Sequence, residues 1–77
     1  MHEDRNNREG LFLRKRRIEL GLTQGQVAEQ AEIEMQAYQR YEYGKNRLSN
    51  ASMRIGLRIC KTLEIDPYDI IFGSNEV

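Results

Sequence analysis

The segment that most constrains the fold of this 77-residue chain runs from Gly21 to Gly44. Its pattern is typical of two short helices joined by a tight turn. Gly21 can end a preceding helix in the left-handed conformation at little steric cost. Thr23 and Gln26, three residues apart, have the spacing of a capping box, which begins a new helix at Gln24. Gly44 predicts the end of the second helix of the pair.

The apolar residues of this segment fall only where such a helix pair must bury them. Val27, Ala28 and Ala31 share one face of the first helix because they lie at i, i+1 and i+4. Tyr38 and Tyr41 form the inward side of the second helix. The outward side is mostly polar and consists of Glu34, Met35, Gln36, Gln39, Arg40 and Tyr43. A helix with such a side is suited to lie in a groove of a partner.

Length and pattern together predict one domain. Seventy-seven residues are enough for one modest hydrophobic core and too few for a second. Residues 1–8 are polar, lack periodic apolar positions and are predicted to form a flexible arm. Residues 9–73 form the domain, and residues 74–77 form a tail. We expect five helices and no strand, so the predicted fold class is all-α, a compact five-helix bundle.

The helices around the central pair are predicted from apolar positions and caps. The first runs over residues 9–20, and Ile18 extends its apolar side. The fourth starts at either Ser49 or Ser52 and continues to about Leu63, because serine is a favoured cap. The loop between the third and fourth helices contains turn residues and two positive charges.

The fourth helix has a predicted buried stripe. Its members are Met53, Gly56, Leu57, Cys60 and Leu63. Ile59 lies at the flank of this stripe, and Ile55 lies well off it, on the side otherwise given to Arg54 and Arg58. A glycine in mid-helix costs about 1 kcal/mol relative to alanine, so a close backbone contact is expected at Gly56.

The fifth helix carries more apolar residues than it can bury. Asp66 and Pro67 begin it as its cap and first residue, and Gly73 ends it. Three successive apolar residues lie between them, and one short helix cannot bury all three against one core. An exposed apolar patch usually marks a surface for a partner. The predicted homodimer interface consists of Ile55, Ile70, Ile71 and Phe72. A hydrophobic cap on a monomer is the alternative.

The overall charge gives no clear sign of the partner. The chain has 12 basic and 12 acidic residues, a formal net charge of zero that argues mildly against nucleic-acid binding. Distribution matters more than the sum, however. Basic residues cluster over residues 14–17 and at Lys45 and Arg47, whereas many acids lie near the two ends of the chain. The molecule can therefore have a basic side.

Composition argues against several other classes. The lone cysteine, Cys60, cannot form an internal disulfide and suits a reducing compartment. The single histidine, His2, lies far from Ser49, Ser52 and Cys60, so we expect no catalytic residue, no metal site and no cofactor. No apolar run reaches membrane-spanning length, and no signal-peptide core is present. We expect a cytoplasmic protein that is not an enzyme and has no membrane partner.

Four parts of the chain resemble one known family. They are LRKRRIELGLTQGQVAEQAEI, the pair Tyr38 and Tyr41, YEYGK, and KTLEIDPYDIIFG. Together they are similar to the Cro/repressor-type helix-turn-helix family, also called the XRE family, over about Leu13 to Phe72. The resemblance implies a lambda-repressor-like bundle whose third helix enters the major groove of DNA. It also implies a dimer that binds a near-palindromic operator.

The resemblance also implies roles for individual residues. The base-reading positions are Met35, Gln36, Gln39 and Arg40, with Gln39 placed to serve either a base or a phosphate. The positions of DNA phosphate contacts are Gln24, Tyr43, Lys45, Asn46 and Arg47. Arg17 and Glu42 match positions that form a partly buried ion pair in some relatives. Glutamine can pair twofold with adenine and arginine with guanine, each pair contributing roughly 1–3 kcal/mol of discrimination.

This sequence departs from the family pattern in the turn and the following loop. Glu32 stands where glycine is usual, which strains the backbone or alters the turn. Glu34 replaces a small hydroxyl cap, and its carboxylate complements the helix dipole but faces phosphate unfavourably. The loop over residues 45–51 is a few residues longer than is common in the family.

The resemblance implies a homodimeric, sequence-specific DNA-binding transcriptional regulator of bacterial or phage type. Its expected partners are double-stranded DNA and a second copy, with RNA polymerase as a further candidate and no small-molecule ligand. Such a protein is nucleoid-associated within the cytoplasm. A repressor is the default, and an activator remains open if Glu29 or Glu34 touches polymerase. The alternative is a protein-interaction module, such as an antitoxin or adaptor, that uses the apolar patch over residues 70–72.

Overall fold

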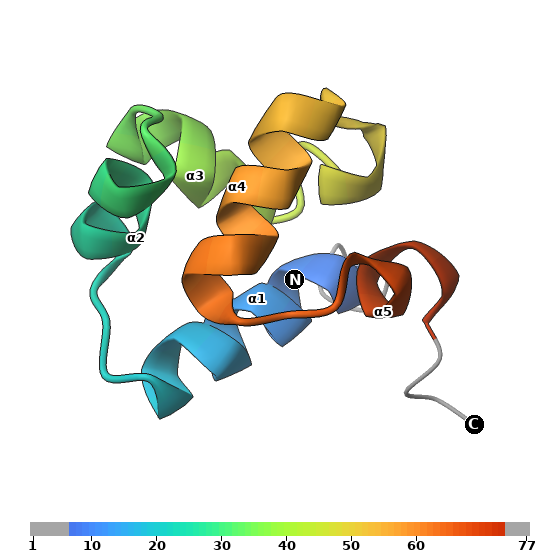
Figure 1. Cartoon of the computed structure of the whole chain (residues 1–77), viewed down its shortest axis with the longest axis horizontal. Coiled ribbons are helices and arrows are strands. Elements are labelled where there is room, and N and C mark those ends of the chain that lie inside the picture. The colour runs from blue at the N-terminus through green and yellow to red at the C-terminus, as the bar shows by residue number, and fades with distance from the viewer. Residues whose placement is uncertain (1–6, 74–77) are drawn as a thin grey trace.

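The structure, a computed structural model, describes residues 7–73, and within them the fold is all-helical (Figure 1). The elements are α1 (Arg8–Glu19), α2 (Gln24–Ala31), α3 (Met35–Glu42), the 3₁₀ helix η2 (Leu48–Asn50), α4 (Met53–Leu63) and α5 (Pro67–Phe72). The prediction of an all-α bundle with five α-helices is confirmed. Most of the predicted arm and the whole predicted tail lie outside the described residues.

The starts of the later helices follow caps that were read from the sequence. The backbone N–H of Gln26 donates to Thr23 Oγ1 (3.0 Å), and the backbone N–H of Thr23 donates to Gln26 Oε1 (2.9 Å). This is the predicted capping box. Ser52, and not Ser49, caps α4 by accepting a backbone N–H, and Asp66 caps α5 in the same way.

Helix α1 begins at Arg8 because Asn7 caps it. The Asn7 side chain accepts the backbone N–H of Gly10 (3.2 Å) and donates to the backbone carbonyl of Glu42 (2.8 Å). A Cβ on Gly10 would collide with this carbonyl and with the Asn7 amide, so glycine is required there. Asn7 is only 7% exposed. The predicted flexible arm over residues 1–8 is therefore wrong for Asn7 and Arg8, which belong to the folded domain.

The turn between α2 and α3 keeps a left-handed residue although no glycine is present. Glu32 has φ 62° and ψ 42°, the conformation that ends α2. The backbone N–H of Ile33 then donates to the carbonyl of Ala28 at 3.0 Å, which closes the turn. The unusual residue does not alter the turn, and the chain accepts a backbone strain of about 1–2 kcal/mol instead.

The hydrophobic core lies where α1, α2, α3 and α4 meet, with α4 running between the α2–α3 pair and α5 (Figure 1). Its buried members are Leu13, Val27, Ala28, Ala31, Tyr38, Leu48, Ile59, Cys60, Leu63, Ile65 and Ile70. The predicted inward residues of the helix pair are among them, and Tyr41 packs against this core from its edge. The helix pair is thus fixed to the rest of the bundle by the side that the sequence predicted.

Helix α4 buries only part of the predicted stripe. Cys60 and Leu63 are buried as predicted. Ile59 and Leu63 are fully buried, and Ile55, one turn before Ile59, packs against the core. Met53 and Leu57 are instead exposed, at 78% and 48%. Positions i, i+4 and i+8 of a helix lie nearly in line, so this rotation turns three branched side chains inward. Ile55, which the sequence analysis placed at a dimer interface, is partly buried and packs against the core.

The apolar ends of α1 and α5 also differ from the prediction. Ile70 is 2% exposed and belongs to the core, whereas Ile71 and Phe72 are 55% and 63% exposed. A helix as short as α5 presents only one of these successive side chains inward, because each step rotates by about 100°. Ile70 is thus also corrected from interface to core. Ile18 was expected on the buried side of α1 and is 54% exposed.

Candidate nucleic-acid interface

Helix α3 is anchored along one side and exposed along the other. Tyr38 and Glu42, one turn apart, are buried at 0% and 3% exposure. Gln36 and Arg40, also one turn apart, are exposed on the opposite side. Neither side chain packs inside the bundle or lies beneath a neighbouring element, which the predicted groove-facing role requires.

The remaining residues predicted to face DNA from α3 lie on the same exposed arc. At about 100° per residue, Gln39 falls between Met35 and Gln36 around the helix axis. Met35 is exposed, and Gln39 is half-buried. Tyr43, the residue that follows α3, is 52% exposed. The structure therefore brings all four predicted base-reading positions to one face of one helix.

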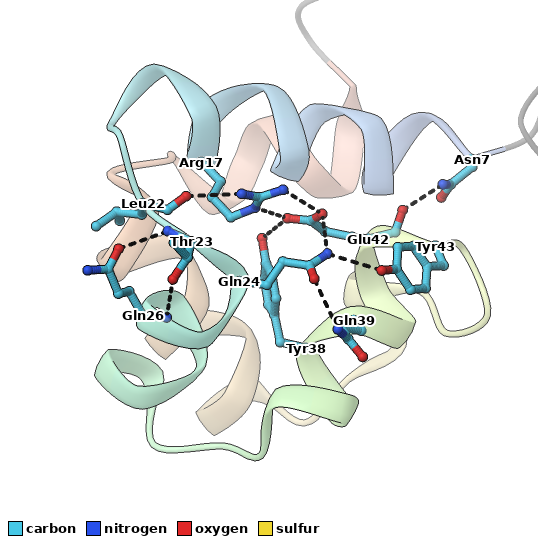
Figure 2. Close-up of polar contacts among 10 residues, drawn as sticks. All are labelled: Asn7, Arg17, Leu22, Thr23, Gln24, Gln26, Tyr38, Gln39, Glu42 and Tyr43. Carbon is cyan, nitrogen blue, oxygen red and sulfur yellow. Dashed lines mark hydrogen bonds and ion pairs between the residues drawn. The ribbon is translucent and has the colours of Figure 1, made fainter.

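A buried carboxylate holds α3 against α1 and α2. Glu42 accepts hydrogen bonds from Arg17 Nε (2.5 Å) and Nη2 (3.2 Å), from the Tyr38 hydroxyl (2.6 Å) and from Gln24 Nε2 (3.0 Å) (Figure 2). The Arg17–Glu42 ion pair that the resemblance implied is present in the structure. Arg17 Nη1 also donates to the backbone carbonyl of Leu22 (3.0 Å). The helix that faces outward is thus tied to the bundle by charge as well as by apolar contact.

The electrostatics of this cluster favour the ionised pair. Burial alone would raise the pKa of Glu42, but the hydrogen bonds from Arg17, Tyr38 and Gln24 outweigh it and lower that pKa. The hydrogen bond to Glu42 raises the pKa of Arg17 against the effect of its own burial. Burial, together with the hydrogen bond to Glu42, raises the pKa of Tyr38. All three groups therefore keep fixed protonation states near neutral pH.

Gln24 does not stand free at the start of α2. Its Nε2 donates to Glu42 Oε1 (3.0 Å) and to the Tyr43 hydroxyl (3.4 Å), and its Oε1 accepts from Gln39 Nε2 (3.0 Å) (Figure 2). Sequence reasoning missed this engagement. A glutamine in the first turn of a helix carries no local signal for contacts with residues 15 to 19 positions away.

The loop after α3 presents cations beside the exposed helix face. Lys45, Asn46 and Arg47 are all exposed, and the backbone N–H groups of the first two donate to the Arg40 carbonyl at 2.9 and 3.2 Å. These bonds fix the start of the loop to the end of α3. A hollow of about 310 Å³ lies here, lined by Tyr41, Lys45, Asn46, Arg47, Asn50 and Ala51. The predicted phosphate-contact residues of the loop therefore adjoin the predicted base-reading face.

The cations beside the exposed face of α3 are not occupied by the ion pairs of the described residues. Among residues 7–73, the ion pairs join Lys15 and Arg16 to Glu19, Arg16 to Glu64, Arg17 to Glu42, and Arg58 to Glu32. These pairs occupy cations of α1 and α4. In this described part of the chain, Arg40, Lys45 and Arg47 take part in none of them. These three cations are therefore available to an anionic partner, and the exposed carboxylate of Glu34 at the start of α3 opposes them.

A second surface, between α4 and α5, is apolar. A groove of about 250 Å³ there is lined in part by Gly56, Cys60 and Ile70. Its rim carries the exposed side chains of Met53, Leu57 and Ile71. The exposed rings of Tyr68 and Phe72 pack on each other, with centroids 4.7 Å apart. The apolar surface that the sequence predicted near the C-terminal end therefore exists, with different members on α4.

Other kinds of site have little support in the described part of the chain. Cys60 is buried, and burial together with Asp66 raises the pKa of its thiol to about 11. No group of three or more metal-ligating side chains occurs within residues 7–73. Within the same residues, no helix has the length and apolar character needed to cross a membrane.

Comparison with known proteins gives one match. A family model described as "Helix-turn-helix domain" matches residues 10–68, most of the chain. The matched range begins within α1, includes α2, α3 and α4, and ends at the start of α5. No curated protein and no solved structure matches the chain.

Proposed function

The chain belongs to the helix-turn-helix domain family of DNA-binding proteins, and on that premise we propose that it is an XRE-type, sequence-specific transcriptional regulator. It binds a near-palindromic operator as a homodimer, with α3 in the major groove. The observation that carries the proposal is the two-sided character of α3. Tyr38 and Glu42 anchor one side, and Gln36 and Arg40 stand exposed on the other.

The spacing on α3 suits base reading. Gln36 and Arg40 are separated by about 6 Å along the helix, roughly two base-pair steps of DNA. Arg40 has the chemistry to pair twofold with guanine and Gln36 with adenine. Met35 can contribute apolar contact with a thymine methyl group.

The adjoining loop suits the DNA backbone. Lys45 and Arg47 supply cations, and Asn46 and Tyr43 supply neutral hydrogen-bond donors. Contacts to phosphate set the register of a protein on the duplex, whereas contacts to base edges set its specificity. The two groups of residues therefore have separable effects on binding.

Dimerisation is proposed through the apolar surface between α4 and α5. Its exposed members are Met53, Leu57 and Ile71, and the exposed Phe72 follows Ile71 on α5. Exposed apolar side chains around an apolar groove are typical of an interface, and a second copy of the chain offers the same surface in return. A symmetric dimer accounts for a near-palindromic site, because each copy reads one half.

Repression is the proposed outcome of binding, because a protein that occupies a promoter blocks polymerase without further contacts. Activation through Glu29 or Glu34 is the alternative mode. The apolar surface between α4 and α5 also favours a second candidate function, that of an antitoxin or adaptor that binds a different protein. This candidate requires no DNA affinity, so the two functions are separable by experiment.

Binding to duplex DNA at varied salt tests the proposed function. Sites are first selected from a random pool, and Kd is then measured on the selected site and on scrambled DNA. Arg40→Ala should lose preference at one base pair, whereas Lys45→Ala should weaken binding to every sequence and reduce the log–log salt slope by about 0.9. Lys61→Ala is the matched control, because it removes an exposed cation from α4. Absence of DNA binding even at low salt would favour the antitoxin or adaptor.

The dimer is tested separately, by sedimentation velocity. Leu57→Glu places a charge on the apolar surface between α4 and α5 and should convert the protein to a monomer. Ile18→Glu is the matched control, because it alters an equally exposed apolar side chain on α1 (54% against 48%). If both variants remain dimeric, the interface lies elsewhere.

A further inference from the structure

A branched network of hydrogen bonds connects the buried carboxylate of Glu42 to the exposed face of α3. Glu42 and Gln24 form its first link, at 3.0 Å. From Gln24, one branch leads to Gln39 at 3.0 Å and the other to the Tyr43 hydroxyl at 3.4 Å (Figure 2). This hydrogen-bond network therefore connects the interior of the bundle to two residues of the proposed DNA surface.

The buried carboxylate determines which group donates and which accepts in every hydrogen bond of this network. Beside Arg17, Glu42 is ionised and can only accept hydrogen bonds. Gln24 must therefore turn its NH₂ group toward Glu42, and its carbonyl oxygen must point away from that carboxylate. An amide orientation that is otherwise hard to assign is thus determined by chemistry. Both N–H groups of Gln24 are then occupied, one by Glu42 and one by Tyr43.

These donor and acceptor assignments determine which groups of Gln39 and Tyr43 remain available to a partner. Gln39 must donate one N–H to the Gln24 carbonyl, so its own carbonyl oxygen and its second N–H remain for a partner. The Tyr43 oxygen accepts from Gln24, so its single hydrogen is left to donate outward. An acceptor beside a donor is the pattern that pairs twofold with adenine, and a lone donor suits a phosphate oxygen.

We propose that Gln24 is a positioning residue. Its amide is oriented by the ionised Glu42 carboxylate, and it in turn orients two side chains of the DNA surface. Through Gln24, the Gln39 amide is oriented to read adenine, and the Tyr43 hydroxyl is oriented to donate to a backbone phosphate. The Gln24 side chain itself does not donate to phosphate, because both of its N–H groups are used within the protein. This inference rests on the proposed DNA-binding function and assigns a different role to Gln24 from that implied by family resemblance.

The test compares base preference with overall affinity. Kd is measured for the 77-residue chain on its selected site and on single-base variants of that site. Gln39→Ala should abolish a preference for adenine of about 5- to 150-fold at one base pair. Gln24→Met, which keeps the length of the side chain but removes the amide, should reduce the same preference at the same base pair. The preference at the base pair read by Arg40 should stay unchanged, and the double variant should lose no more than Gln39→Ala alone.

A matched control separates positioning from a general loss of structure. Gln30→Met makes the same substitution at an exposed position of α2 and should leave every base preference intact. Urea midpoints of all variants are measured in parallel, since a change in stability alone does not alter base preference at one position. The inference is overturned if Gln24→Met keeps the full adenine preference, or weakens all sequences equally. A wild-type protein that prefers no sequence would instead overturn the proposed function itself.

Tyr43 gives an independent readout of the second branch. Tyr43→Phe should weaken binding to all sequences severalfold without changing the salt slope, because the lost donor is neutral. Lys45→Ala should weaken binding and also reduce the slope, because a neutralised phosphate is lost. If Tyr43→Phe binds as tightly as the wild type, the hydroxyl does not donate to DNA and this branch of the inference fails.

Discussion

The Arg17–Glu42 pair offers the sharpest test of what holds α3 in place. The proposed change is Arg17→Met, which keeps much of the length of the side chain but removes its charge. In the wild-type structure the Glu42 side chain is 1% exposed and the Arg17 side chain is 13% exposed. The variant therefore leaves a carboxylate inside the bundle without its cation, while most apolar packing around position 17 is kept.

The expected loss of stability follows from this burial. Removing one partner of a buried ion pair costs about 3–5 kcal/mol, because the remaining charge is not resolvated. Tyr38 and Gln24 still donate hydrogen bonds to Glu42, so we expect the lower end, about 3 kcal/mol. A domain of 77 residues has a total stability of roughly 4–12 kcal/mol. The melting temperature should fall by roughly 12–24 °C, at about 4–8 °C per kcal/mol.

Urea unfolding followed by circular dichroism measures this loss. The matched control is Arg58→Met, which breaks the Arg58–Glu32 pair, whose side chains are 42% and 70% exposed. An exposed pair contributes less than about 1 kcal/mol, so this control should shift the midpoint only slightly. Adding Glu42→Gln to Arg17→Met should recover part of the loss, because no buried charge remains. Equal losses for Arg17→Met and Arg58→Met would refute the reasoning.

Three further predictions concern other groups. Because the folded pKa of Glu42 is lowered from about 4.5, its contribution to the free energy of unfolding is full above that pH and lost as pH falls through the folded pKa; Glu42→Gln should flatten this acid side in urea midpoints taken from about pH 7 to about pH 3. Glu32→Gly should raise stability by about 1 kcal/mol in the same assay, because glycine adopts φ 62° without strain. Cys60, whose thiol pKa is raised to about 11, should react with a thiol reagent slowly in the folded protein and rapidly in urea.

The helix pair and its caps could be predicted because their determinants are local. Thr23 and Gln26 lie three residues apart, and each satisfies the backbone of the other. Tyr38 and Tyr41 fall on one side of α3 by helical spacing alone. Such features depend on bonds within one or two turns, so the sequence contains all the information that is needed.

The buried face of α4 was predicted only in part, correctly for Cys60 and Leu63 and wrongly for Met53 and Leu57, because both sides of this helix are apolar. Met53 and Leu57 make as good a stripe as Ile55 and Ile59 when only spacing is considered. The choice between them depends on the shape of the surface that α2 offers to α4, which is a property of the assembled bundle. The contacts of Gln24 could not be predicted for the same reason, because its partners Gln39 and Tyr43 lie 15 to 19 residues away, toward the C-terminal end of α3.

The position of the Glu42 cluster is itself informative. An apolar cluster of the same volume would hold α1, α2 and α3 together at least as well, because burying charge has a desolvation cost. Apolar contacts cannot fix the orientation of a polar side chain, since only hydrogen bonds distinguish its donors from its acceptors. In this bundle the direction imposed by the Arg17–Glu42 pair passes through Gln24 and ends on atoms of Gln39 and Tyr43 at the protein surface. Under the proposed function, the buried ion pair at the C-terminal end of α3 therefore contributes to DNA recognition as well as to folding.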